Sequence, residues 1–123
     1  MNAMARWVAL SALVCLLVAS AVRADAFSGA YYDPRTDELV VTMIYQGTNP
    51  DHRFSVQWGK CQKLGMSGDV HQIAVEVLDS QWSDAASQNF TKTVRFSLAG
   101  LHCRPADVTL RTAPRFYYTV HVP

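Results

Sequence analysis

The chain has 123 residues, of which 50% are hydrophobic and 17% are charged, and its formal net charge is +1. This balance excludes a disordered acidic tail and a strongly basic nucleic-acid-binding protein. The length allows one domain.

The first 26 residues have the three parts of a secretory signal peptide. Arg6 precedes an apolar run over residues 7–22, and Ala24-Asp25-Ala26 offers the small-x-small pattern that signal peptidase cleaves, with a second cleavage position after Ala24. A membrane anchor is the alternative, but no basic stop-transfer cluster follows the run. We therefore expect residues 1–26 to be removed as a signal peptide and residues 27–123 to form a single periplasmic or secreted domain.

Two cysteines, Cys61 and Cys103, remain in the predicted mature chain. Exported proteins fold in an oxidising compartment, where such a pair forms a disulfide rather than two reactive thiols. We expect a structural disulfide between them.

Apolar and polar residues alternate with a period of two through the mature chain, and no apolar stripe of helical period reaches ten residues. Seven strands are predicted, at residues 30–33, 38–46, 53–58, 71–78, 90–98, 107–112 and 115–122. Short strands at regular spacing without crossover helices are typical of two antiparallel sheets packed face to face. The predicted fold class is therefore an all-β antiparallel sandwich, with a small barrel as the alternative.

The segment Phe96-Ser97-Leu98-Ala99-Gly100-Leu101, which precedes a predicted strand, resembles the corner between late strands in fibronectin-type and other immunoglobulin-like domains. The resemblance implies an immunoglobulin-like topology. The sequence departs from true immunoglobulin domains because Trp58 lies just before Cys61, and Leu101 stands where a tyrosine precedes the second cysteine.

Charge is unevenly distributed along the predicted mature chain. Residues 27–89 carry four basic and eight acidic side chains, whereas residues 90–123 carry five basic and one acidic. Arg95, Arg111 and Arg115 would form an anion-binding or partner-binding patch if they lay on the outer face of one sheet, because arginine presents a planar fork of donors. A solvated face on which Glu76 or Asp79 pairs with these arginines is the alternative.

Histidines raise the question of a metal site, since imidazole suits copper and zinc. His52 and His102 are the first candidates because both lie in predicted loops near cysteine-bearing segments. The spacing of a blue-copper site is absent, and no C-x-x-C or H-x-x-x-H pair would preorganise zinc. The sequence therefore predicts no cofactor, and a copper or zinc site remains an alternative.

Three aromatic or imidazole side chains are candidates for a protein interface. Trp82 lies near the middle of the longest segment without periodicity, and Tyr117 and His121 share a face of the last predicted strand. Exposed aromatics and edge strands are both used in protein recognition.

No catalytic signature such as G-x-S-x-G occurs in the sequence. We therefore expect a small exported, non-enzymatic module that binds a protein or a small anionic ligand, and not nucleic acid. The alternatives are a periplasmic copper- or zinc-binding protein and an inhibitor of a secreted hydrolase that uses the Trp82 loop. Neither the identity of the ligand nor the oligomeric state follows from the sequence.

Overall fold

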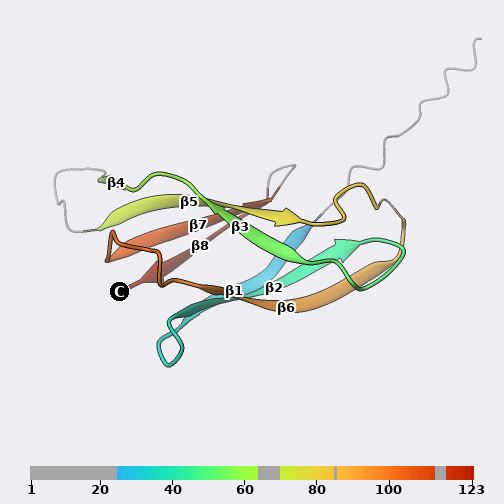
Figure 1. Cartoon of the computed structure of the whole chain (residues 1–123), viewed down its shortest axis with the longest axis horizontal. Coiled ribbons are helices and arrows are strands. Elements are labelled where there is room, and N and C mark those ends of the chain that lie inside the picture. Colours follow the sequence, from blue (N-terminus) through green and yellow to red (C-terminus); the bar gives the residue numbers. More distant parts are fainter. Residues whose placement is uncertain (1–24, 64–69, 85, 113–115) are drawn as a thin grey trace, which may run out of the picture.

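The computed structural model describes residues 25–63, 70–84, 86–112 and 116–123, which form eight strands and no helix (Figure 1). The strands are β1 (Ala26–Asp33), β2 (Glu38–Gln46), β3 (Phe54–Trp58), β4 (Gln62–Lys63), β5 (His71–Asp79), β6 (Asn89–Ser97), β7 (Ala106–Thr112) and β8 (Phe116–Val122). The predicted all-β class is confirmed.

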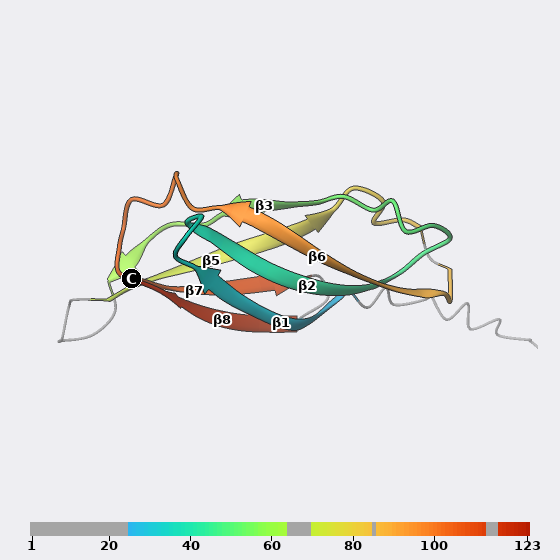
Figure 2. The same ribbon diagram turned by 90° about the horizontal axis from the view of Figure 1, so that it is seen from below.

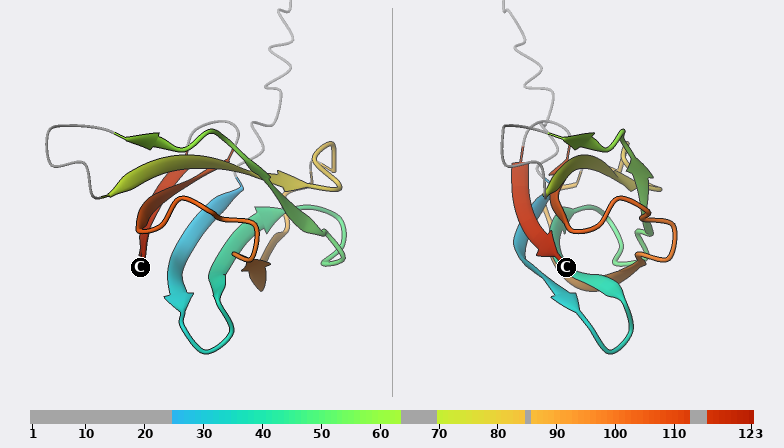
Figure 3. Two further views of the ribbon diagram at one scale, coloured as in Figure 1. Left: turned by 60° about the vertical axis from the view of Figure 1, so that its left-hand side comes forward. Right: turned by 90° about the vertical axis from the view of Figure 1, so that its left-hand side faces the viewer.

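Two sheets pack face to face, as Figures 1 and 2 show. The three-stranded sheet has the order β1-β2-β6, and the five-stranded sheet has the order β3-β5-β7-β8, with β4 pairing with β5 beyond the end of β3. At one side of the sandwich β1 lies beside β8, and at the other side β3 approaches β6 (Figure 3). The two layers therefore meet along both sides and enclose one core.

All seven predicted strands are present, and two differences have local causes. The first strand begins at Ala26, four residues before the predicted start. A register shift between Phe27 and Gly29 interrupts the alternation of side chains there, so the sequence pattern does not indicate this part of the strand. The eighth strand, β4, has only two residues, which is too short to give a periodic signal.

The prediction of antiparallel pairing is wrong for one pair of strands, because β5 and β7 run parallel. The strand between them in the chain, β6, belongs to the other sheet, so the chain reverses direction twice before it returns beside β5. Immunoglobulin domains consist of two antiparallel sheets, and this sandwich departs from them at the β5–β7 pair.

The core is built from the inward side chains of both sheets. Along β2, the side chains of Leu39, Val41, Met43 and Tyr45 are almost fully buried, as expected for the central strand of its sheet. The facing side chains alternate in the same way along the five-stranded sheet. Its buried apolar members are Ile73, Val75, Val77, Ala106, Val108, Leu110, Val120 and Val122.

The predicted disulfide between Cys61 and Cys103 is present. Cys61 lies in the short connection between β3 and β4, and Cys103 lies in the connection that carries the chain from β6 back to β7. The bond therefore ties the edge of the five-stranded sheet to the segment that changes sheets.

Only the last part of the predicted signal peptide, Asp25 and Ala26, falls within the described residues. Ala26 is the first residue of β1. Asp25 is 8% exposed, and its backbone carbonyl accepts a 2.8 Å hydrogen bond from Thr112 Oγ1. Both residues are therefore part of the folded domain. Among the described residues, no helix has the length and hydrophobicity needed to cross a membrane.

Replacing both cysteines by serine should lower the free energy of unfolding by about 4 kcal/mol, because the bond closes a loop over 42 positions of sequence and restricts the unfolded chain. Urea denaturation of the oxidised protein and of the Cys61→Ser/Cys103→Ser variant measures the difference. A loss of less than about 1 kcal/mol would contradict a structural role for this disulfide.

Candidate functional site

A hollow of about 560 Å³ lies on the outer face of the five-stranded sheet. This volume is in the range of small-molecule binding sites. Ile73, which borders the hollow, belongs to the core, whereas the other lining residues of β5 and β7 alternate with core residues such as Val75 and Val108 and point away from the core. The residues that line it are Gly59, Lys60, Gln62, Gln72, Ile73, Ala74, Thr109, Arg111 and Tyr117.

The hollow forms because short side chains lie between longer ones on neighbouring strands. Ala74 on β5 and Thr109 on β7 are register partners and form the floor. Gln72 rises on one side of this row, and Arg111 with its β8 partner Tyr117 rises on the other. The depression therefore follows from the register of three strands.

One wall comes from the connection between β3 and β4, which lies very close to β5. The Gly59 amide donates a 2.8 Å hydrogen bond to the Ala74 carbonyl, and a Cβ atom at Gly59 would lie only 2.7 Å from the same oxygen. A glycine is therefore needed for this close approach, which brings the adjacent Lys60 to the hollow. The disulfide of the next residue, Cys61, holds the same wall.

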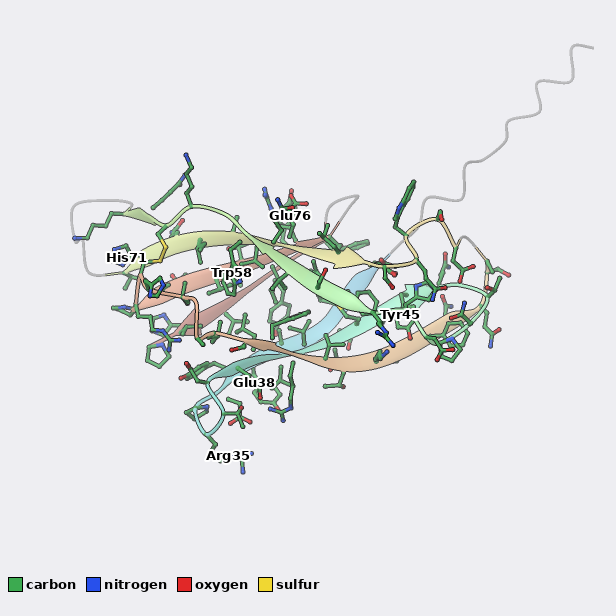
Figure 4. All side chains as sticks on the ribbon, viewed as in Figure 1. Arg35, Glu38, Tyr45, Trp58, His71 and Glu76 are labelled. Atoms are coloured by element: carbon green, nitrogen blue, oxygen red, sulfur yellow. A yellow bond between two sulfur atoms is a disulfide. The ribbon has the colours of Figure 1, made fainter. Side chains whose placement is uncertain are left out.

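The charged groups of the hollow leave it with unbalanced positive charge. Arg111 Nη2 donates a 3.2 Å hydrogen bond to Glu76 Oε1, and Figure 4 shows Glu76 on the outer face of the sheet. Arg111 Nε is buried and has no hydrogen-bond partner among the described residues. Lys60 has no carboxylate partner within the described part of the chain. A negatively charged group would complement both cations.

The three predicted patch arginines are not brought together. Arg95 lies on β6, in the opposite sheet, where its Nη1 donates to Asp33 Oδ2 at 3.1 Å and to Glu38 Oε1 at 3.4 Å. Arg115 lies outside the described residues. Of these arginines, Arg111 is the one that the structure places at the hollow. It pairs with Glu76, as the alternative of a solvated face predicts.

The candidate interface residues are also divided. Tyr117 is 58% exposed and lines the hollow beside Arg111. His121 lies further along the same face of β8, where its Nδ1 is 2.8 Å from Asp107 Oδ1. Trp82 is 74% exposed in the turn that follows β5, and it does not line the hollow.

His52 lies in a buried polar cluster rather than in an open metal site. Its ring is 0% exposed, with Nδ1 2.7 Å from Asp79 Oδ2 and Nε2 2.9 Å from Asp84 Oδ2. An ionised carboxylate only accepts hydrogen bonds, so each ring nitrogen must carry a proton to bond to an ionised partner. The His52 hydrogen bond holds the pKa of Asp84 below its usual value, assisted by the backbone amide of Thr48.

The same cluster joins two connections at one end of the sandwich. The His52 ring packs on Tyr45, with ring centroids 4.9 Å apart, and the Tyr45 hydroxyl donates a 2.7 Å hydrogen bond to the Pro50 carbonyl. Lys92 Nζ donates to the His52 carbonyl at 2.9 Å. A Cβ atom at Gly47 would lie 2.5 Å from His52 Nε2, so the packing around the ring leaves no room for a side chain there.

Among the residues that the structure describes, neither metal candidate is grouped with further metal ligands. Both ring nitrogens of His52 are already hydrogen-bonded, and His102 is exposed in the connection between β6 and β7. Within the described residues, no three histidine, cysteine or acidic side chains are grouped so that they could hold a metal ion.

Arg104 organises the opposite end of the sandwich. Its guanidinium donates to both carboxylate oxygens of Asp37, at 2.7 and 2.8 Å, and to the Leu98 and Leu101 carbonyls. Asp37 lies at the tip of the β1–β2 hairpin with φ of 53°. The hydrogen bonds from Arg104 hold the pKa of Asp37 below its usual value and raise the pKa of Arg104.

Sequence reasoning missed the residues that complete these sites. Lys60, Gln62 and Gln72 belong to the hollow, and Arg104 belongs to the hairpin contact. The short outward side chains of Ala74 and Thr109 could indicate the floor of the hollow. They do so only once the parallel register of β5 and β7 is known, because that register places them side by side. No local pattern around Arg104 indicates its partner.

The comparisons with known proteins give no relative for this chain: no family model, no curated protein and no solved structure matches it.

Replacing His52 by alanine should lower the free energy of unfolding by about 3 kcal/mol, because it leaves the buried Asp79 carboxylate without its ring partner. The matched control, His102→Ala, removes an exposed ring and should change it by less than about 0.5 kcal/mol. Urea denaturation measures both. A rise in the unfolding midpoint on adding zinc or copper that is lost in His102→Ala would instead support a metal site.

Acid should weaken the contact at the hairpin tip. Because the folded-state pKa of Asp37 is depressed, its stabilising contribution is present at neutral pH and is lost as pH falls from near 4, its usual pKa, through the lower folded value. Asn tolerates the left-handed backbone of Asp37, so Asp37→Asn removes the charge without straining the turn. Thermal unfolding between pH 6 and pH 2 should show a smaller acid-dependent fall in Tm for Asp37→Asn, and an unchanged fall would refute the assignment.

Proposed function

We propose that the protein is a small exported, non-enzymatic binding module that holds a small anionic ligand in the hollow on its five-stranded sheet. The observation that carries the proposal is the meeting of Arg111, Lys60 and Tyr117 around one concave site. Arginine and lysine supply charge-assisted hydrogen bonds to an anion, and the exposed phenol ring supplies contact area.

Export is supported by the leader-like residues 1–26 and by the disulfide, because structural disulfides persist in oxidising compartments. The packing of Asp25 and its hydrogen bond from Thr112 favour cleavage after Ala24 over cleavage after Ala26. In our proposal the mature protein therefore begins at Asp25 and works in the periplasm or outside the cell.

One observation favours a second candidate, an inhibitor of a secreted hydrolase. Trp82 is the most exposed large apolar side chain among the described residues, and hydrogen bonds from Gln81 N to Asp79 Oδ1 and from Asp84 N to the Gln81 carbonyl hold its turn. A preorganised tryptophan suits insertion into a partner's pocket. We rank this candidate second because the charged groups near the turn give no complementary pattern that would specify the partner.

Titration of isotope-labelled protein with citrate should shift the backbone amide signals of residues in the hollow, including those of Thr109, Arg111 and Tyr117. Arg111→Gln should weaken this binding about tenfold, the effect of losing a hydrogen bond to a charged group. The matched control is Arg35→Gln, which removes the same charge from an exposed hairpin on the other sheet.

Equal weakening of citrate binding by Arg111→Gln and Arg35→Gln would show that binding depends only on the net charge of the protein and would refute the proposed site. Absence of shifts at the hollow would also refute the proposed site.

A further inference from the structure

The position of the hollow restricts how a ligand can be recognised there. It lies on the face of the sheet, where the backbone groups of β5 and β7 bond to strands on both sides and β8, the last strand of the sheet, pairs with β7. Peptides that bind to sheets usually add as a strand at an open edge, where unpaired backbone groups supply the hydrogen bonds. A ligand in this hollow must instead be held mainly by side chains.

The side chains on one wall are suited to hydroxyl groups. Gln62 on β4 and Gln72 on β5 are register partners, so their carboxamides rise next to each other from the same face. Each carboxamide provides both donors and an acceptor, and the Thr109 hydroxyl on the floor does the same. Vicinal hydroxyls of a sugar ring also donate and accept, and they match such a set of groups.

The opposite wall combines a flat ring with a cation. Arg111 and Tyr117 are partners in the β7–β8 register, and cross-strand partners have Cβ atoms about 5 Å apart. The exposed Tyr117 ring can pack against the C–H groups on one face of a pyranose. A carboxylate on the edge of the same pyranose would then lie beside the Arg111 guanidinium, with Lys60 as a second cation.

We propose that the ligand is an acidic saccharide, a sugar ring that carries a carboxylate as in a uronic acid. This inference rests on the proposed function and specifies its ligand. The sugar ring packs on Tyr117, its hydroxyls bind Gln62, Gln72 and Thr109, and its carboxylate binds Arg111 and Lys60.

Three probes separate the parts of this recognition: methyl glucuronide, methyl glucoside, which has the same ring without the carboxylate, and glutarate, which has carboxylates without a ring. Amide shifts of the labelled protein are followed during each titration. Methyl glucuronide should bind at least tenfold more tightly than either of the other two.

Variants assign the contacts. Tyr117→Leu and Gln72→Ala should weaken methyl glucuronide binding severalfold and leave glutarate binding unchanged, whereas Arg111→Gln should weaken both. Thr42→Ala, a substitution on the outer face of the three-stranded sheet, is the control and should change neither. Gln72 and Tyr117 are both exposed on the protein surface, and the amide spectrum of each variant verifies its fold.

The outcomes distinguish the inference from the proposed function. If glutarate binds in the hollow as tightly as methyl glucuronide, the hollow is a general anion site and the saccharide inference is wrong. If methyl glucoside binds as tightly as the glucuronide, the carboxylate has no role and the inference is also wrong. If none of the probes, citrate included, shifts the hollow signals, the proposed function fails as well.

Discussion

Burial of the inward side chains of β2 against the five-stranded sheet is the interaction on which the rest of the structure depends. Leu39, Val41 and Met43 have no exposed surface, and the strands on either side of β2 complete the layer that covers the core. Because side chains alternate along each strand, fixing the inward set also fixes which residues face outward. The floor and one wall of the hollow are formed by the outward set of β5, β7 and β8, so this part of its geometry follows from the packing of the core.

Polar contacts have a different role, since they fix the connections at the two ends. The His52 cluster joins the connection after β2 to the turn after β5, and Arg104 joins the β1–β2 hairpin to the connection after β6. Ion pairs contribute little net stability, because desolvation offsets the attraction of a buried pair and solvent screens a partly exposed one such as Arg104–Asp37. The hydrogen bonds in these contacts depend on direction, so they hold the connections at each end of the sandwich in one arrangement. The apolar core supplies most of the stability.

Most of the fold could be predicted from the sequence, because alternation is a local property that each strand displays independently. The seven predicted strands, the two-sheet class and the Cys61–Cys103 bond are all present. The pairing of strands could not be predicted in full, since the direction of β7 beside β5 depends on which sheet receives β6. The sequence indicates Arg111 by its charge and Tyr117 by its place on the last strand, but it does not indicate Lys60, Gln62 and Gln72, because their part in the site depends on this pairing.

The predicted patch of arginines also depends on how the strands are divided between the two sheets. A basic C-terminal segment indicates that cations are close in sequence, but Arg95 and Arg111 lie on opposite sheets because the chain changes sheets between them. Arg95 binds two carboxylates of its own sheet, whereas Arg111 has one carboxylate partner and a buried Nε without one in the described structure. What distinguishes the surroundings of Arg111 is thus the short floor next to it and the wall held by the disulfide, and neither can be inferred from charge alone.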